Sequence, residues 1–245
     1  MHLRLPPQPH LSLKRNKINL YLLEKDWQSA ITKIVRHPHR CQKWSSRVGF
    51  FDGDHESRVL PIHVACSLHA PLEVVRAIVN AYPGCLTVRE SSFKRLPIHV
   101  ACMFAAPEDV IEYLAREHVA GTLAEDVMGR LPLHYACSNG LPMAVVETFL
   151  SVNPASTLYA DFNGWLPLHV AVHFGASTKV VRVIVRVCPA AVTIETMKST
   201  TALSLAEKVG TNNRDEVIAV LRDATVTGQN DTIQSSFVRR AAMAA

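Results

Sequence analysis

The most constraining feature of this chain is a seven-residue motif that recurs at a nearly constant interval. Four copies read Leu-Pro-[Ile/Leu]-His-x-Ala-[Cys/Val] and begin at Leu60, Leu96, Leu131 and Leu166, and a weaker fifth copy begins at Thr201. Successive copies are 36, 35, 35 and 35 residues apart. A period of this length indicates stacked supersecondary units, because one unit alone cannot bury its apolar face. We therefore expect an elongated array with a long open surface.

Each unit contains signals for two short helices. The motif proline suits the first turn of a helix, where its missing N–H costs nothing. About ten residues further on, a second proline at 71, 107 or 142, or Ser177 in the fourth copy, predicts the start of a second helix. The second helices repeat apolar residues at helical spacing, so one face of each must be buried against a neighbouring unit.

A turn of the form Asp-x-x-Gly, at Asp126 and at Asp161, precedes the third and fourth copies of the motif. This order of helix, turn, helix and Asp-x-x-Gly turn before Pro-x-His-x-Ala resembles the ankyrin repeat over about residues 54–224. The resemblance implies an all-α solenoid of stacked helix-turn-helix units with turn or hairpin tips. It also implies that the motif histidines bond backbone groups between units. The chain departs from the usual pattern by placing leucine, rather than a capping threonine, before the proline.

These signals predict three segments: a basic flexible leader over 1–23, a repeat array over 24–224 and a disordered tail over 225–245. The expected units of the array are a partial cap at 24–53, repeats near 54–89, 90–125, 126–160 and 161–195, and a degenerate last repeat at 196–224. The first connection is about nine residues longer than the others. This 39–59 insertion contains Trp44, Phe50 and Phe51, and is either a binding loop or an inert segment whose aromatic rings cover the cap.

Positive charge is concentrated near the N-terminus. Residues 1–50 hold ten lysines and arginines against Glu24 and Asp26, a net charge of +8, whereas the rest of the chain is at −3. A basic arm of this kind can contact nucleic acid, an anionic membrane surface or an acidic protein, or it can be a solvated leader. No apolar run approaches the roughly 18 residues that a membrane span needs, so we expect no membrane span.

Three copies of the motif contain His-x-x-Cys, beginning at His63, His99 and His134. Zinc needs four such ligands at about 2.0–2.3 Å, and one unit offers only two, with the next pair roughly 8–10 Å away. We therefore expect no metal, no other cofactor and buried, reduced cysteines, which favours an intracellular, cytoplasmic or nuclear protein. The chain has no glycine-rich phosphate loop and no unexplained nucleophile, so it is not expected to be an enzyme.

The predicted function is that of a non-enzymatic scaffold or adaptor that binds a protein partner through its concave face. The ankyrin resemblance implies that this face is formed by the tips and by the outer residues of the first helices. The candidate partner-binding residues at those positions are Phe93, Arg95, Met103, Phe104, Met128, Arg130, Phe162, Asn163, Trp165 and Phe174. Such side chains are the usual interface anchors, although some of the rings could instead pack on neighbouring tips. The alternative is a nucleic-acid or chromatin-associated regulator, in which the basic arm contacts phosphates and the repeats recruit a protein.

Overall fold

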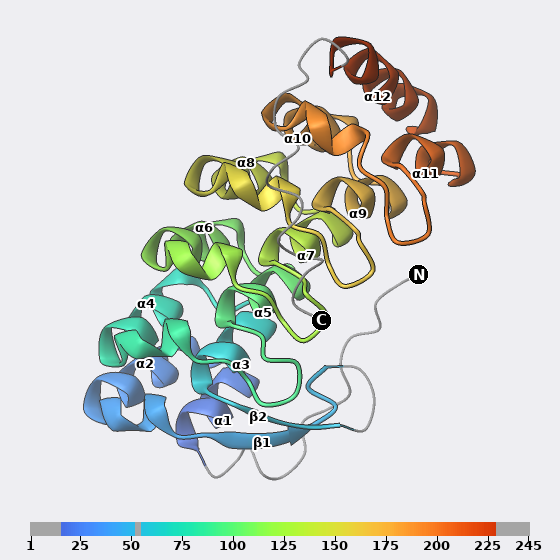
Figure 1. Cartoon of the computed structure of the whole chain (residues 1–245). Helices are drawn as coiled ribbons and strands as arrows, with labels where there is room; N and C mark the ends of the chain where they lie inside the picture. The colour runs from blue at the N-terminus through green and yellow to red at the C-terminus, as the bar shows by residue number, and fades with distance from the viewer. Residues whose placement is uncertain (1–15, 52–54, 229–245) are drawn as a thin grey trace. The chain divides into compact units, whose positions relative to one another are not determined.

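The computed structural model describes residues 16–51 and 55–228, and the chain divides into two compact units, Met1–Gly121 and Thr122–Ala245. The described residues form twelve α-helices, short 3-10 helices and one two-stranded sheet (Figure 1). The boundary between the two units follows Gly121 and falls within the 24–224 span for which the sequence predicts the array. No helix in the described part of the chain is long and apolar enough to cross a membrane.

Unit 1 contains three helix pairs and the sheet. The pairs are α1 (Lys17–Leu23) with α2 (Trp27–Arg36), α3 (Pro61–Ser67) with α4 (Leu72–Ala81), and α5 (Pro97–Met103) with α6 (Glu108–Glu117). The 3-10 helices η2 (Pro38–Gln42) and η3 (Pro83–Thr87) follow α2 and α4. First helices pack on first helices and second helices on second helices, as in a stacked repeat. Strand β1 (Ser45–Val48) pairs antiparallel with β2 (Glu56–Val59), with Ser45 opposite Val59.

Unit 2 continues the same pattern with three further pairs. They are α7 (Pro132–Ser138) with α8 (Met143–Val152), α9 (Pro167–His173) with α10 (Thr178–Val187), and α11 (Ala202–Lys208) with α12 (Arg214–Gly228). The 3-10 helices η5 (Pro154–Leu158) and η6 (Pro189–Val192) follow α8 and α10, and η4 (Val119–Leu123) spans the boundary between the units. Each first helix packs on the next first helix, and each second helix on the next second helix.

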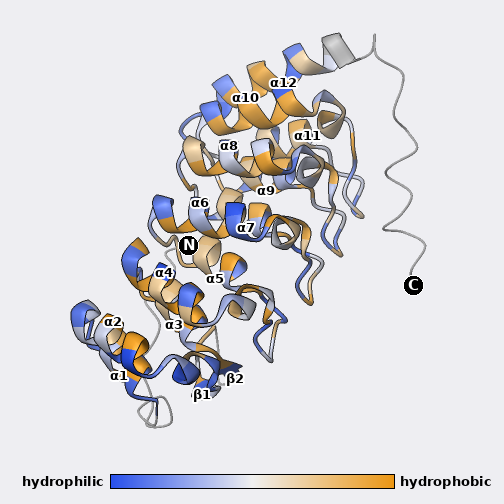
Figure 2. Cartoon of the chain, turned by 90° about the vertical axis from the view of Figure 1, so that its left-hand side faces the viewer, coloured by the Kyte–Doolittle hydropathy of each residue, from blue (hydrophilic) through white to orange (hydrophobic). Residues whose placement is uncertain are grey.

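The core of each unit is built from the repeated motif and the apolar stripes of the second helices. The leucine that replaces the capping threonine is buried in all four good copies, at Leu60, Leu96, Leu131 and Leu166. Burial of a leucine side chain contributes about 1.5–3 kcal/mol, which exceeds the roughly 1 kcal/mol expected from a threonine cap. Second helices such as α10 and α12 show hydrophobic residues alternating with hydrophilic ones (Figure 2), as amphipathic helices do.

Two positions in the repeat adopt left-handed backbone conformations. One lies between the two helices of a pair, at His69, Ala105, Gly140 and Gly175, and the other lies at the tip, at Lys94, Gly129, Gly164 and Ser199. Glycine adopts this conformation without steric cost, whereas it is energetically unfavourable for other residues. The chain therefore keeps the turn geometry even where a unit lacks the glycine.

Two predicted boundaries at the ends need correction, while the predicted helical fold class is confirmed. Residues 17–23 of the predicted flexible leader form α1, because Ile18 and Leu22 lie one turn apart and are fully buried; residues 1–15 lie outside the described part. Helix α12 continues to Gly228, past the predicted boundary at 224, and 229–245 also lie outside it. The fold is helical apart from the β1–β2 pair, which forms within the 39–59 insertion.

Candidate functional site

The motif histidines join successive repeats through backbone groups. The Nδ1 atoms of His63, His134 and His169 accept hydrogen bonds from the N–H of the leucine three residues earlier, at 3.2, 3.0 and 3.1 Å. Their Nε2 atoms lie 3.1, 3.0 and 3.1 Å from the carbonyl oxygens of Val88, Trp165 and Ile194. A carbonyl oxygen can only accept, so Nε2 carries the proton and donates.

This arrangement leaves no lone pair for a metal ion, because both ring nitrogens of each histidine already have partners. Burial lowers the pKa of His63 and of His134 to about 4, so both rings are neutral near pH 7. Among the described residues, no group of three or more histidine, cysteine, aspartate or glutamate side chains is arranged to hold a metal ion. All six cysteines are free and buried. The histidines are therefore structural joints.

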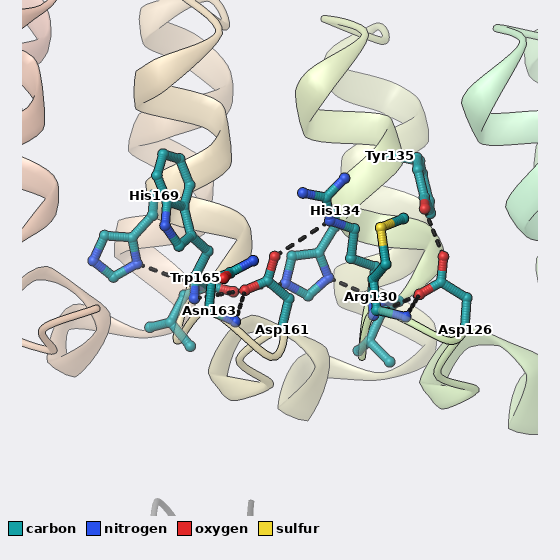
Figure 3. A network of polar contacts seen from close by, with 11 residues as sticks. Asp126, Arg130, His134, Tyr135, Asp161, Asn163, Trp165 and His169 are labelled. Carbon is teal, nitrogen blue, oxygen red and sulfur yellow. Dashed lines mark hydrogen bonds and ion pairs between the residues drawn. The ribbon is translucent and has the colours of Figure 1, made fainter. Parts of the chain in front are cut away.

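The tip loops are held by a polar side chain at one repeat position, occupied by Glu90, Asp126, Asp161 and Thr196. Asp161 shows the pattern, since its Oδ1 accepts from the backbone N–H groups of Asn163 at 2.9 Å and Trp165 at 3.0 Å (Figure 3). Asp126 does the same with Met128 and Arg130, at 2.8 and 3.0 Å. Each tip thus has its conformation fixed from within.

Successive tips of unit 2 are also bonded to each other. The N–H of Phe162 donates to the carbonyl oxygen of Met128 at 3.0 Å, and the N–H of Met197 donates to that of Asn163 at 3.1 Å. The result is a ladder of three tips, which presents their side chains from a rigid backbone.

Side chains add a second set of links to the same ladder. Arg130 Nε donates to Asp161 Oδ2 at 3.2 Å, and Tyr135 Oη donates to Asp126 Oδ2 at 2.6 Å (Figure 3). Both carboxylates are buried and receive several hydrogen bonds, whereas the Arg130 side chain is 35% exposed. Arg130 is therefore oriented by a buried partner and still reaches the surface.

A groove of about 380 Å³ lies between these tips and the first helices α7 and α9 in unit 2. Trp165 and Phe174 line it, and the ring of His173 contacts both edge-on at centroid distances of 5.0 Å. Arg130 and Lys198 contribute positive charge to the lining. Phe162 stands beside the groove with 61% of its surface exposed, while Phe174 is 57% and Met197 76% exposed.

In unit 1 the equivalent positions are in contact with the 39–59 insertion and are at least half-buried. The ring of Phe51 lies 5.2 Å from Phe93 and 6.3 Å from Phe104, and the guanidinium of Arg95 lies 4.6 Å from the Phe51 ring. Arg95 is almost fully buried, and its Nη1 is 3.1 Å from the sulfur of Met103. The Phe50 and Phe51 rings of the insertion therefore pack against residues of the second repeat rather than against the cap.

The ten predicted partner-binding residues thus fall into two groups. The four in unit 1, Phe93, Arg95, Met103 and Phe104, form a cluster with the insertion. The other six, Met128, Arg130, Phe162, Asn163, Trp165 and Phe174, lie in or beside the exposed groove and tips of unit 2.

Ser138, His173, Met197 and Lys198 also line the groove. The repeat spacing places them on the same predicted face, because His173 is 35 residues after Ser138 and Met197 is 35 residues after Phe162, although they are not among the ten candidate residues.

Comparison with known proteins agrees with the repeat geometry. A family model of ankyrin repeats, in three copies, matches residues 62–157. No curated protein matches the sequence significantly. The matched segment includes two complete Pro-x-His-x-Ala motifs and begins one residue inside a third, and the structure shows paired helices and histidine joints over a longer range. Residues 62–157 of the chain therefore consist of ankyrin repeats.

Proposed function

We propose that this protein is a non-catalytic scaffold or adaptor that binds a protein partner through the groove of unit 2. Ankyrin repeats are in general protein–protein interaction modules, and the family is typically non-enzymatic. The observation that supports the proposal most is that Phe162, Phe174 and Met197 are exposed in and beside a groove that Trp165 lines. Aromatic and methionine side chains of this kind are enriched among interface anchors.

The rigid ladder beneath these side chains favours binding. An interface loses affinity when its loops and side chains must be ordered, and the hydrogen bonds within and between the tips have already fixed the backbone. Burying each exposed anchor would contribute about 1.5–3 kcal/mol. Arg130 and Lys198 would form a polar part of the same surface, which orients a partner rather than supplying most of the affinity.

The compartment belongs to the same proposal. We place the protein in the cytoplasm or nucleus, because its six cysteines are free and buried in the core of the repeats. Burial raises the pKa of the thiols of Cys85 and Cys137 to about 12, so these groups are poor nucleophiles. That observation supports a packing role for the cysteines rather than a catalytic one.

Site-specific photo-cross-linking tests the groove. A cross-linking amino acid replaces Phe162 or Phe174, and in a matched control it replaces Val187, which is 40% exposed at the end of α10. We expect one defined partner band from the two groove positions and none from the control. The double variant Phe162→Ala/Phe174→Ala should lose the partner while keeping its thermal denaturation curve. Equal cross-linking from position 187, or partner binding by the double variant, would contradict the proposal.

A further inference from the structure

Unit 1 has a concentration of positive charge at the C-terminal end of α2. Lys33 and Arg36 lie in the last turn of α2, and Arg40 lies in η2 directly after it. The side chain of Asn16, which caps α1, donates from Nδ2 to the carbonyl oxygen of Arg40 at 3.1 Å. This bond brings the start of α1, and with it Lys17, to the same place. We call Lys17, Lys33, Arg36 and Arg40 the N-terminal cationic patch.

The nearby carboxylates lie at the other end of α2. Glu24 and Asp26 belong to the turn between α1 and α2, where Asp26 accepts a hydrogen bond from the N–H of Ser29 at 3.0 Å. Helix α2 has ten residues, so the turn and the patch are about 15 Å apart. None of the four basic side chains forms an ion pair with a residue that the structure describes.

The proximity of these charges is unfavourable within the folded unit. Desolvation and then the positive charges of Lys17, Arg40 and Arg36 lower the pKa of Lys33, with no acid to oppose them. The Nε atom of Arg40 is buried and has no hydrogen-bond acceptor among the described residues. An unpaired buried donor costs about 1–3 kcal/mol.

Helix stabilisation accounts for only part of the patch. Basic residues in the last turn of a helix interact favourably with its dipole, by about 0.3–1 kcal/mol, which explains Lys33 and Arg36. It does not explain Lys17, which is the first residue of α1 and lies at the end where a cation is disfavoured. Arg40 lies in the last turn of η2, yet its Nε has no acceptor among the described residues. Arrangements that break a local rule without a compensating contact are found at functional sites.

We infer that the N-terminal cationic patch binds the phosphate backbone of a nucleic acid without reading its sequence. Arginine and lysine pair with phosphate oxygens, and a strand with a charge at every nucleotide can contact all four side chains at once. A lipid surface is less suitable, because the apolar residues Ala30 and Ile34 of α2 are buried in the core of unit 1 and cannot enter a membrane. This activity is separate from the groove of unit 2.

Fluorescence anisotropy with the full chain tests the inference. The probes are a labelled 20-nucleotide single strand and a duplex of the same length, titrated at several salt concentrations between 50 and 200 mM. The test variant is Lys17→Gln/Arg36→Gln/Arg40→Gln. The matched control, Lys179→Gln/Arg182→Gln/Arg186→Gln, removes three exposed charges from α10 of unit 2. A double variant, Lys17→Gln/Arg36→Gln, changes only exposed side chains and serves if the triple variant melts early.

The number of phosphate contacts sets the expected result. Four contacts to a single strand give a salt slope of about −2.8, which weakens binding about 50-fold between 50 and 200 mM salt. The triple variant loses three contacts, so its slope should be less steep by about 2, while the basic residues elsewhere in the chain contribute equally to both proteins. The control should retain the slope of the unmodified chain.

Three outcomes would overturn the inference. The first is that the unmodified chain binds neither probe at 50 mM salt, and the second is that the control loses as much affinity as the test variant. The third is binding to anionic phospholipid vesicles or to a poly-glutamate peptide but to neither nucleic acid. Loss of nucleic-acid binding in the patch variants, with the groove cross-link of unit 2 unchanged, would support the inference independently of the proposed partner.

Discussion

Acid should destabilise this protein through the histidines that join its repeats. His63 in unit 1 and His134 in unit 2 are buried and neutral, and each has a pKa of about 4 in the folded chain. In the unfolded chain a histidine titrates near 6.5, so between these values the unfolded state binds more protons. The stabilisation from the neutral ring is therefore present above about pH 6.5 and is lost as the pH falls towards 4.

The magnitude follows from the two pKa values. At pH 5 a histidine with a folded pKa of about 4 and an unfolded pKa of 6.5 lowers the free energy of unfolding by about 2 kcal/mol relative to pH 7. His63 and His134 together give about 4 kcal/mol, and His169, whose pKa burial also lowers, adds in the same direction. Most carboxylates remain ionised at pH 5 in both states and contribute little over this range.

Urea denaturation at pH 7, 6 and 5, followed by circular dichroism at 222 nm, measures this loss. In the variant His134→Gln, the difference between pH 7 and pH 5 should be smaller by about 2 kcal/mol, because one of the shifted groups has been removed. The control His55→Gln changes an exposed side chain and should leave the difference unchanged. A flat free energy between pH 7 and 5, or an unaltered difference in His134→Gln, would refute the assignment of these histidines as neutral joints.

Further predictions concern packing, turns and thiols. Phe51→Ala should lower the free energy of unfolding by about 3–5 kcal/mol because its ring is buried, whereas Phe162→Ala should change it by less than about 0.5 kcal/mol; similar effects in thermal denaturation would contradict the assigned burial. Ser199→Gly should stabilise by about 0.5–1 kcal/mol, since Ser199 has a φ of 49°. Gly164→Ala should destabilise by more than that, because its Cβ would lie 2.7 Å from the backbone nitrogen of Met197. Thermal denaturation tests both variants, and a destabilised Ser199→Gly or a stabilised Gly164→Ala would contradict the tip geometry. All six thiols should react slowly with a disulfide reagent in the native protein and rapidly in urea, and a fast-reacting native thiol would contradict their burial.

The repeated motif was sufficient to predict most of the fold. Its proline occupies the first turn of helices such as α3 and α7, and its leucine and histidine make the same contacts in the copies described above. One local pattern, found four times, therefore predicts the helix pairs and the resemblance to ankyrin repeats. The role of the histidines as joints was also predicted from the resemblance. The helix at Lys17–Leu23 was not predicted. The basic residues and the prolines upstream indicated a flexible leader, and only two apolar residues, Ile18 and Leu22, are buried by this helix.

The candidate site was predicted only in part. Phe93 and Phe162 are both tip aromatics, and nothing in the period distinguishes them. Phe51, from an insertion some forty residues before Phe93, packs on it, while the structure leaves Phe162 exposed. Apolar residues at helical spacing predict which side chains are buried within a helix pair. They do not predict which exposed positions a distant loop packs against.

The sequence by itself therefore determined the repeating unit, its hydrogen-bonded joints and the repeat positions that we propose for partner binding. These depend on contacts within a unit or between adjacent units, which a 35-residue period encodes directly. The tertiary structure decided which aromatic rings stay exposed, which pack against the 39–59 insertion, and how the start of α1 comes to lie beside Arg40. Those features depend on nonlocal packing of segments that do not repeat, and so no periodic signal in the chain could reveal them.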